Sequence, residues 1–361
     1  MNGLNIRCES MLGTTHSWAV TMRSLLKEFH KNKNEIYIKS INGYDFFPEN
    51  VNYNRKNILN PDIDISYTLP RNFKFRFNKN SKLKLAIYNY ETSILPEVWR
   101  DAHKHIDYAL PSSNFSKEVF VNSGWPEEKC IVVPHGIFKS DFKDKRKVIF
   151  GTKKSFKFLN VSIPHYRKNI DILLDTYYSA FSSKDDVCLV LKTNLSKPKN
   201  YFEIDLKKAI HNIQKKHNGR TDLPQVEIVQ KKFDSIIPLY NSCDCLVSAS
   251  SAEGFGLPLL EALAAGMLVV SPRCSGQLDF LNDKNSLLYD TDTVSAEKEY
   301  QYWRASLGAK TYMPRKDDLG SAMISAYKNR EKLKKDFSSE VSLTINKFTW
   351  ENAAKKILKI S

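Results

Sequence analysis

Short apolar segments alternate with amphipathic stretches along this 361-residue chain, and this alternation restricts its fold more than any other feature. It is typical of parallel sheets, because each parallel connection needs a crossover that is usually a helix. We expect strands at residues 4–10, 35–41, 83–90, 108–112 and 131–134, and in a second series at 156–162, 187–193, 226–230, 245–249 and 268–271. The expected helices span residues 17–29, 95–105, 116–123, 170–181, 204–216, 235–241 and 258–265, with two Lys-rich helices from about residue 317. The pattern predicts an α/β protein with two mostly parallel sheets.

Two such series, in a chain longer than one hydrophobic core usually supports, indicate two domains. The hydrophobic content of 42% is sufficient for two packed cores and excludes a largely disordered chain. The segment Lys139–Lys147 is rich in Lys and Asp and poor in apolar residues, as is typical of a linker. We therefore expect a first domain over residues 1–145 and a second over 146–335.

The first residues lack the basic start and apolar run of a signal peptide, and no stretch reaches the length of about eighteen apolar residues that could span a membrane. The six cysteines are scattered, with no paired C-x-x-C spacing that would suit a structural zinc. We expect reduced thiols, a cytoplasmic location and no bound metal. The formal net charge of +15 would attract phosphate-bearing partners, although a general bias toward Lys and Asn explains it equally well.

The segment from Ser248 to Gly266 predicts a strand, a glycine loop and then a helix. Pro258 suits the first helical turn, and Gly266 suits the left-handed position just past the helix end. Gly254 and Gly256 would let backbone N–H groups approach a phosphate or a sugar hydroxyl closely. The carboxylates of the two glutamates, one before the helix and one within it, would serve different parts of one ligand. The alternative is an ordinary strand–helix junction with solvent-facing glutamates.

The run from Glu253 to Glu261 resembles the E-x7-E signature of the family 4 retaining glycosyltransferases. These enzymes have the GT-B fold, in which two Rossmann-like domains with mostly parallel sheets face a central cleft. The resemblance implies transfer of a hexose or pentose from a nucleotide-sugar without a metal or other cofactor. It implies that Glu253 meets the donor sugar near the reaction centre and that Glu261 holds the ribose hydroxyls. The amides of Phe255, Gly256 and Leu257 would contact the sugar and phosphate.

Residues 158–174 resemble the strand, basic loop and helix of the same family, except that Arg167-Lys168-Asn169 stands where Arg-Lys-Gly is usual. Two cations suit this place, because the departing diphosphate gains negative charge that must be stabilised. Arg167 and Lys168 are therefore candidate catalytic residues. Ser162 replaces a further arginine of many relatives, and Lys192 could supply that charge to the donor. The alternative is that these are solvated basic residues at strand ends.

The resemblance extends to the first domain with less detail. It implies that the loop from Gly13 to Ser17 faces the donor phosphates, and that His16 and Glu91 lie on the acceptor side. A helix-capping loop and a strand-end carboxylate are the structural alternatives for these two. It also implies that residues 336–361 end in a helix, near 348–358, that returns to the first domain.

The stretch from Arg71 to Lys84 has six basic residues, three phenylalanines and no acidic residue. Arg71, Lys74 and Arg76 are candidate acceptor-side residues, since basic and aromatic side chains together suit an anionic membrane surface, a phosphorylated glycan or nucleic acid. The alternative is an edge strand with the alternating phenylalanines 73, 75 and 77 on one buried face.

The resemblance implies a retaining transferase whose acceptor is a glycan or glycolipid, and the basic charge would suit peripheral association at the inner membrane face. Glycosylation of a modified DNA base, as some phage enzymes perform, is an alternative that the basic charge would favour. A catalytically silent nucleotide-sugar or nucleic-acid binding module is another, because a fold does not establish an activity.

Overall fold

The computed structural model describes residues 3–13, 16–41, 52–195, 197–198, 203–296 and 308–360. They form two compact units, the first comprising residues 3–137 and 347–360 and the second residues 138–296 and 308–346. The sequence placed the boundary after residue 145 and the return segment from 336, whereas the units divide between Ile137 and Phe138 and again at Lys347.

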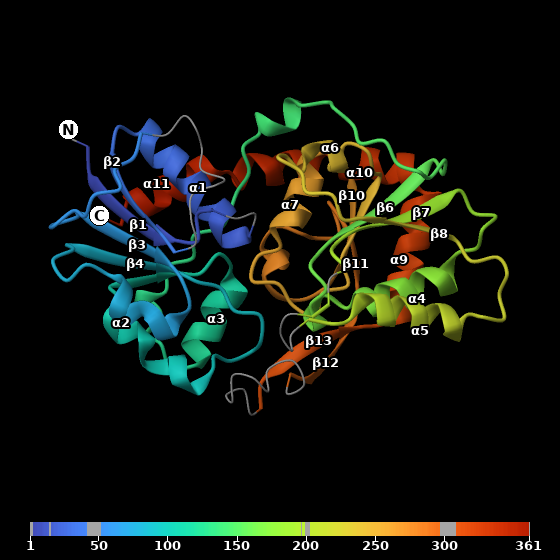
Figure 1. The fold of residues 1–361 in the computed structure, drawn as a ribbon, viewed down its shortest axis with the longest axis horizontal. Helices are drawn as coiled ribbons and strands as arrows, with labels where there is room; N and C mark the ends of the chain where they lie inside the picture. The colour runs from blue at the N-terminus through green and yellow to red at the C-terminus, as the bar shows by residue number, and fades with distance from the viewer. Residues whose placement is uncertain are drawn as a thin grey trace. The chain divides into compact units, whose positions relative to one another are not determined.

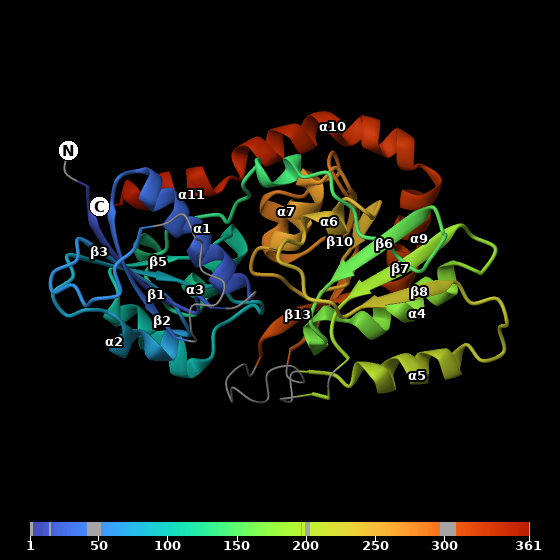
Figure 2. The same cartoon turned by 45° about the horizontal axis from the view of Figure 1, so that its top comes forward.

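A five-stranded parallel sheet forms the centre of the first unit (Figure 1). Its order is β2-β1-β3-β4-β5, from strands β1 (Asn5–Ser10), β2 (Glu35–Ser40), β3 (Ile63–Tyr67), β4 (Leu83–Ile87) and β5 (Tyr108–Leu110). The helical elements are α1 (Ser17–Lys31), η1 (Pro70–Asn72), α2 (Phe73–Arg76), η2 (Glu97–His105), α3 (Asn114–Asn122), η3 (Glu127–Lys129) and α11 (Trp350–Leu358). The C-terminal helix α11 packs along α1, as both ribbon views show (Figures 1 and 2).

The central strand β3 was not predicted, because a strand buried on both faces usually reads as a continuous apolar run, and Ile-Asp-Ile-Ser-Tyr contains an aspartate. Asp64 is nevertheless fully buried. Its carboxylate lies 2.7 Å from Arg7 Nη1, and Arg7 Nη2 lies 2.5 Å from Glu9, which is also fully buried. Arg76 Nη1 contacts Glu9 Oε1 at 2.7 Å. This buried ion-pair network lets a polar strand face occupy the middle of the sheet.

Two further predictions in this unit were wrong, and so was the alternative given for the phenylalanine stretch. Residues 131–134 form no strand, although the amides of Ile131 and Val133 still donate to the chain near β5. The helix expected at 95–105 is a run of 3-10 turns. The phenylalanine stretch is not an edge strand: Phe73 is buried and Phe75 is 73% exposed, because both belong to the short helix α2, where residues two apart face different directions.

The second unit contains a six-stranded parallel sheet of order β11-β10-β9-β6-β7-β8. Its strands are β6 (Phe156–Val161), β7 (Val187–Lys192), β8 (Gln225–Val229), β9 (Cys245–Val247), β10 (Leu268–Pro272) and β11 (Leu287–Tyr289). The helical elements are η4 (Asp141–Lys143), η5 (Tyr166–Lys168), α4 (Ile170–Ala180), α5 (Leu206–Lys216), α6 (Ile237–Tyr240), α7 (Leu257–Ala264), η6 (Ser275–Asp279), α9 (Lys316–Lys328) and α10 (Arg330–Lys347). Strands β12 (Thr291–Ser295) and β13 (Lys310–Pro314), which were not predicted, form a separate antiparallel pair.

The strand order of this sheet determines where a ligand can bind. From β6 the chain proceeds outward through β7 and β8, and then returns to place β9 on the other side of β6. The loops after β6 and β9 therefore leave neighbouring strands in opposite directions. In open parallel sheets the crevice at such a switch point, at the carboxyl ends of the strands, is the usual ligand site.

Candidate functional site

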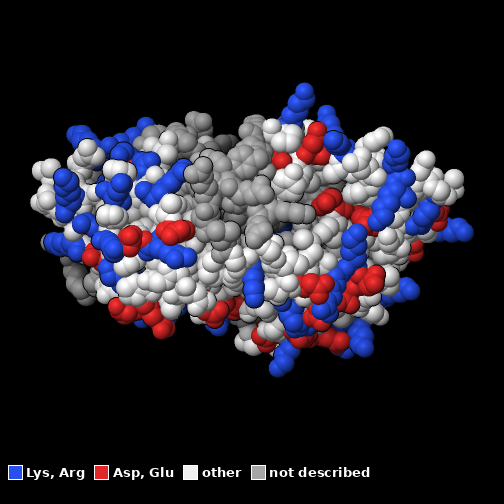
Figure 3. Space-filling model, turned by 90° about the horizontal axis from the view of Figure 1, so that it is seen from below, with Lys and Arg blue, Asp and Glu red and all other residues white. Residues whose placement is uncertain are grey.

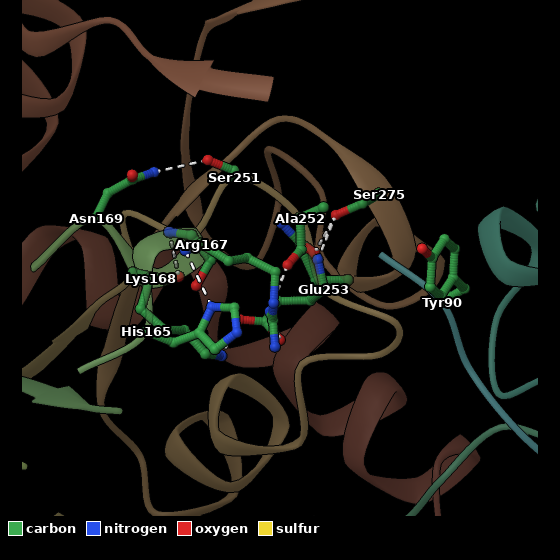
Figure 4. Close-up of polar contacts among 12 residues, drawn as sticks. Tyr90, His165, Arg167, Lys168, Asn169, Ser251, Ala252, Glu253 and Ser275 are labelled. Atoms are coloured by element: carbon green, nitrogen blue, oxygen red, sulfur yellow. Dashed lines mark hydrogen bonds and ion pairs between the residues drawn. The ribbon is translucent and has the colours of Figure 1, made fainter. Parts of the chain in front are cut away.

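Glu253 lies between two cations at this switch point. Lys168 Nζ is 2.5 Å from Glu253 Oε1, and Arg167 Nη1 is 3.1 Å from Oε2 (Figure 4). The cations come from the loop after β6 and the carboxylate from the loop after β9. Each side chain is between 13% and 16% exposed, so water screens these charges only in part. The structure thus brings the three candidate catalytic residues into direct contact.

The charges of the two cations keep Glu253 ionised. Burial alone would raise the pKa of this carboxyl, but Lys168 and Arg167, with a hydrogen bond from Ser250, outweigh burial and lower it to about 2. Glu253 therefore carries a negative charge at neutral pH. It can accept hydrogen bonds and stabilise positive charge, but it holds no proton to donate.

His165 shapes the loop that carries the cations. Its Nδ1 accepts a hydrogen bond from the Arg167 amide at 3.2 Å and begins the turn η5. Burial, together with the charges of Arg167 and Lys168, lowers the pKa of His165 to about 3. The ring is thus neutral, as an accepting Nδ1 requires. Sequence reasoning missed this residue, which carries no signal beyond its place before the basic pair.

A third loop holds Glu253 from the opposite side. The Glu253 amide donates to Ser275 Oγ at 2.9 Å, and the Gly276 amide donates to the Glu253 carbonyl at 2.9 Å. Ser275 itself has a left-handed backbone, with φ of 56°. Neither Ser275 nor Gly276 was predicted as a site residue.

The glycine loop has the geometry that its sequence predicts. Gly256 precedes α7 with φ of +88°, and a Cβ there would lie 3.0 Å from Leu259 Cδ1. Pro258 stands in the first turn, and Gly266, with φ of +77°, follows the helix end, so both capping predictions are confirmed. The candidate donor-binding residues Gly254, Phe255 and Leu257 are buried. A small cavity beside this loop is lined by Asn160, Ser162, Lys168, Ser250, Glu253, Gly256 and Pro258, among others.

Glu261 has a partner different from those of Glu253. Tyr240 Oη donates to Glu261 Oε2 at 2.7 Å, and Tyr240 is almost completely buried. Burial raises the pKa of Glu261 to about 7, with a further contribution from the charge of Asp141, while the Tyr240 hydrogen bond opposes the rise. This carboxyl therefore titrates near neutral pH.

Lys192 ends β7 at the same edge of the sheet, where its carbonyl accepts from the Ser162 amide at 3.1 Å. Its Nζ lies 5.9 Å from the centre of the Phe233 ring. Burial lowers the pKa of Lys192. The structure thus places this predicted donor-binding cation beside the loop that carries Arg167 and Lys168.

The predicted residues of the first unit are spread over several elements. Gly13 is buried after β1, while Thr14 and Thr15 of the same loop lie outside the described residues. His16 caps α1, accepting from the Trp18 amide at 3.3 Å, and Glu91 is half-buried after β4.

The three basic candidate residues of this unit differ in exposure and in their contacts. Arg71 and Lys74 are exposed, and Lys74 Nζ lies 4.6 Å from the centre of the Phe75 ring. Arg76 is instead engaged by the buried carboxylate of Glu9.

Metal sites, membrane spans and surface charge concern the whole of the part of the chain that the structure describes. It contains no group of three or more His, Cys, Asp or Glu side chains that could hold a metal ion. None of its helices is long and apolar enough to cross a membrane. On the face that Figure 3 shows, Lys and Arg side chains are interspersed with Asp and Glu rather than gathered in one patch.

Comparisons with known proteins agree with this architecture. Residues 156–299 match the family described as "Glycosyl transferases group 1". A search of curated proteins found no match. Among solved structures, Alr3699/HepE of Anabaena with bound UDP and glucose is 14% identical, covers 99% of both chains and has a TM-score of 0.69. A glycosyltransferase of Rickettsia africae is 16% identical, with a TM-score of 0.70 over 99% of this chain and 97% of its own.

The lipopolysaccharide outer core galactosyltransferase WaaB is 14% identical, with a TM-score of 0.60 over 99% of both chains. At such identities a structural likeness establishes the fold alone. The fold is the GT-B fold of glycosyltransferases, as the sequence predicted, and the segment from β6 to β12 matches a group 1 glycosyltransferase domain.

Proposed function

We propose that this protein is a metal-independent, retaining glycosyltransferase that transfers a hexose or pentose from a nucleotide-sugar to a glycan or glycolipid. The observation that carries the proposal is Glu253, held between Arg167 and Lys168 at the switch point of the second sheet. Paired charges of this kind, poorly exposed and at the edge where α/β sheets bind ligands, suit the breaking of a bond to a diphosphate.

The charges of Arg167, Lys168 and Glu253 are opposite to those that develop on the two parts of the donor during the reaction. The bond from the anomeric carbon to phosphate oxygen breaks, and negative charge grows on the departing nucleoside diphosphate. Arg167 and Lys168 would neutralise that charge, since two cations against one carboxylate leave a local surplus of one positive charge. Glu253, ionised, would accept a hydrogen bond from a sugar hydroxyl and stabilise the positive charge that develops on the sugar.

Retention follows if the acceptor hydroxyl attacks from the face that the diphosphate leaves. The acceptor oxygen then forms the new bond to the anomeric carbon, and its proton passes to an oxygen of the departing phosphate. Such a step needs no protein nucleophile and no protein base, in keeping with an ionised Glu253 that is already paired with two cations. Glu261 and the amides that precede α7 would hold the ribose and the phosphates.

The acceptor would contact the first unit, where Arg71 and Lys74 are exposed beside Phe75. Basic and aromatic side chains of this kind suit a phosphorylated glycan or the headgroups of a glycolipid at the cytoplasmic membrane face. Salt-dependent binding of duplex DNA would favour the alternative of a transferase that acts on a DNA base.

The test is a panel of UDP-, GDP-, ADP- and dTDP-sugars, each measured for thermal stabilisation and slow donor hydrolysis. UDP-glucose comes first, because Alr3699/HepE was crystallised with it. The measurements are made without added metal and repeated with EDTA, and we expect one donor to respond equally in both. A response that EDTA abolishes would refute metal independence. A donor that stabilises the protein but is not hydrolysed would favour a silent nucleotide-sugar binding module, and a folded protein that no donor stabilises would refute the proposal. Proton NMR of the first transferred sugar would show whether the anomeric configuration is retained.

A further inference from the structure

Among the described residues, Lys33, Asn169 and Ser275 are the non-glycine residues with positive φ. Such a backbone costs free energy and persists where the surrounding structure requires it. Two of the three, Asn169 and Ser275, stand in loops that touch the Glu253 loop. Backbone strain is thus concentrated around the site.

Asn169 combines an unusual backbone with a buried side chain. Its φ and ψ are 45° and 43°, and it joins the turn η5 to helix α4. Its Nδ2 donates to the Ala249 carbonyl at 2.9 Å and to Ser251 Oγ at 2.8 Å (Figure 4). Both acceptors belong to the loop after β9. A glycine would adopt this backbone more easily, but it could not make either hydrogen bond.

These bonds join the two loops that carry the opposite charges of the site. Asn169 directly follows Lys168, and Ser251 stands two residues before Glu253. The Ser251 amide also donates to the Arg167 carbonyl at 2.8 Å, and Arg167 Nη1 donates to the Ala252 carbonyl at 2.6 Å. The spacing of cation and carboxylate is therefore set by hydrogen bonds between the two loops as well as by the ion pairs.

We propose that Asn169 is a positioning residue, whose left-handed backbone and buried carboxamide lock the Arg167–Lys168 loop to the Glu253 loop. The effect of Asn169 on turnover rests on the proposed function, whereas its role in holding the two loops together does not. The backbone conformation aims the two preceding cations toward β9, and the carboxamide holds the carboxylate loop at that distance.

The test compares Asn169→Gly, which keeps the backbone conformation and removes the carboxamide, with Ser251→Ala, which removes one of its two acceptors. Lys33→Gly is the matched control, because Lys33 has φ of 60° but is exposed and lies in the first unit. Hydrogen exchange is measured on peptides covering residues 165–169 and 248–253. Steady-state hydrolysis of the best donor gives kcat and KM.

We expect Asn169→Gly to speed exchange in these two loops and not in the rest of the second unit. We expect kcat to fall about ten- to a hundredfold, as small misplacements of catalytic groups do, with KM changed less than about threefold. Ser251→Ala should have a smaller effect in the same direction, and adding it to Asn169→Gly should change little, because the two act through one contact. Lys33→Gly should leave exchange in both loops and kcat unchanged.

If both loops of Asn169→Gly exchange hydrogen at the wild-type rate, the proposal is overturned. It is also overturned if exchange becomes faster evenly throughout the second unit, because that is the effect of losing a residue that only stabilises the fold. If Asn169→Gly fails to fold, the exchange of Ser251→Ala decides instead. If the wild-type protein hydrolyses no donor, the proposed function fails, and the exchange comparison still decides whether the lock exists.

Discussion

Glu261 should make donor binding depend on pH near neutrality. Burial raises the pKa of this carboxyl to about 7, against a 2.7 Å hydrogen bond from Tyr240 that lowers it. As the proposed partner of the ribose hydroxyls, Glu261 accepts hydrogen bonds more strongly as a carboxylate than as a neutral acid. Donor affinity should therefore rise as the pH increases through 7.

The size of the effect follows from the ionised fraction. If only the carboxylate binds, the competent fraction is about one-tenth at pH 6 and about nine-tenths at pH 8, so the Kd should fall about tenfold over that range. Tyr240→Phe removes the hydrogen bond that lowers the pKa. Its midpoint should move above 7, and its affinity at pH 7 should be weaker than that of the wild type.

The assay is calorimetric titration with an intact UDP-sugar between pH 5.5 and 8.5. The intact donor is needed because the terminal phosphate of free UDP would itself titrate at about pH 6. Glu261→Gln is the control, and its Kd should be independent of pH. A wild-type Kd that is the same at pH 6 and pH 8 would refute the reasoning, as would a Glu261→Gln variant that keeps the wild-type slope.

Three further predictions concern stability and turnover. Because the folded pKa of Glu261, about 7, lies above its unfolded value of about 4.3, ionisation of this residue costs stability as the pH rises from about 4 to 7. In urea denaturation, Glu261→Gln should be more stable than the wild type at pH 8, by up to about 4 kcal/mol, and equal to it at pH 4. Glu253→Gln should lower kcat at least about a hundredfold with little change in donor Kd, and equal losses in both would count against its assignment. Arg7→Met should destabilise by about 3–5 kcal/mol, because Asp64 and Glu9 would lose a buried cation, whereas Arg71→Ala should leave the thermal midpoint unchanged.

Local signals explain which elements could be predicted. The strand, loop and helix around Glu253 were predicted nearly to their observed bounds, because Pro258, Gly256 and Gly266 mark a helix start and end within a few residues. Strand β3 was missed because the burial of Asp64 depends on Arg7, which is distant in sequence. The edge-strand alternative for the phenylalanine stretch was wrong, although alternation over five residues suits a strand, because Phe73 packs against Trp125 from a helical turn that leaves Phe75 exposed.

The candidate site likewise has features that local sequence predicts and others that depend on distant contacts. The sequence alone determined which residues are chemically suited to it, because two glutamates around a glycine loop and a basic pair after a strand are local patterns, made specific by resemblance. Only the tertiary structure decided that Lys168 and Glu253, 85 residues apart, form an ion pair. It also decided that Asn169 and Ser275 hold the loops that carry them, and that Tyr240 hydrogen-bonds Glu261. The physical reason is strand order: β9 pairs with β6 rather than with β8, and this choice depends on burying both faces of the whole sheet.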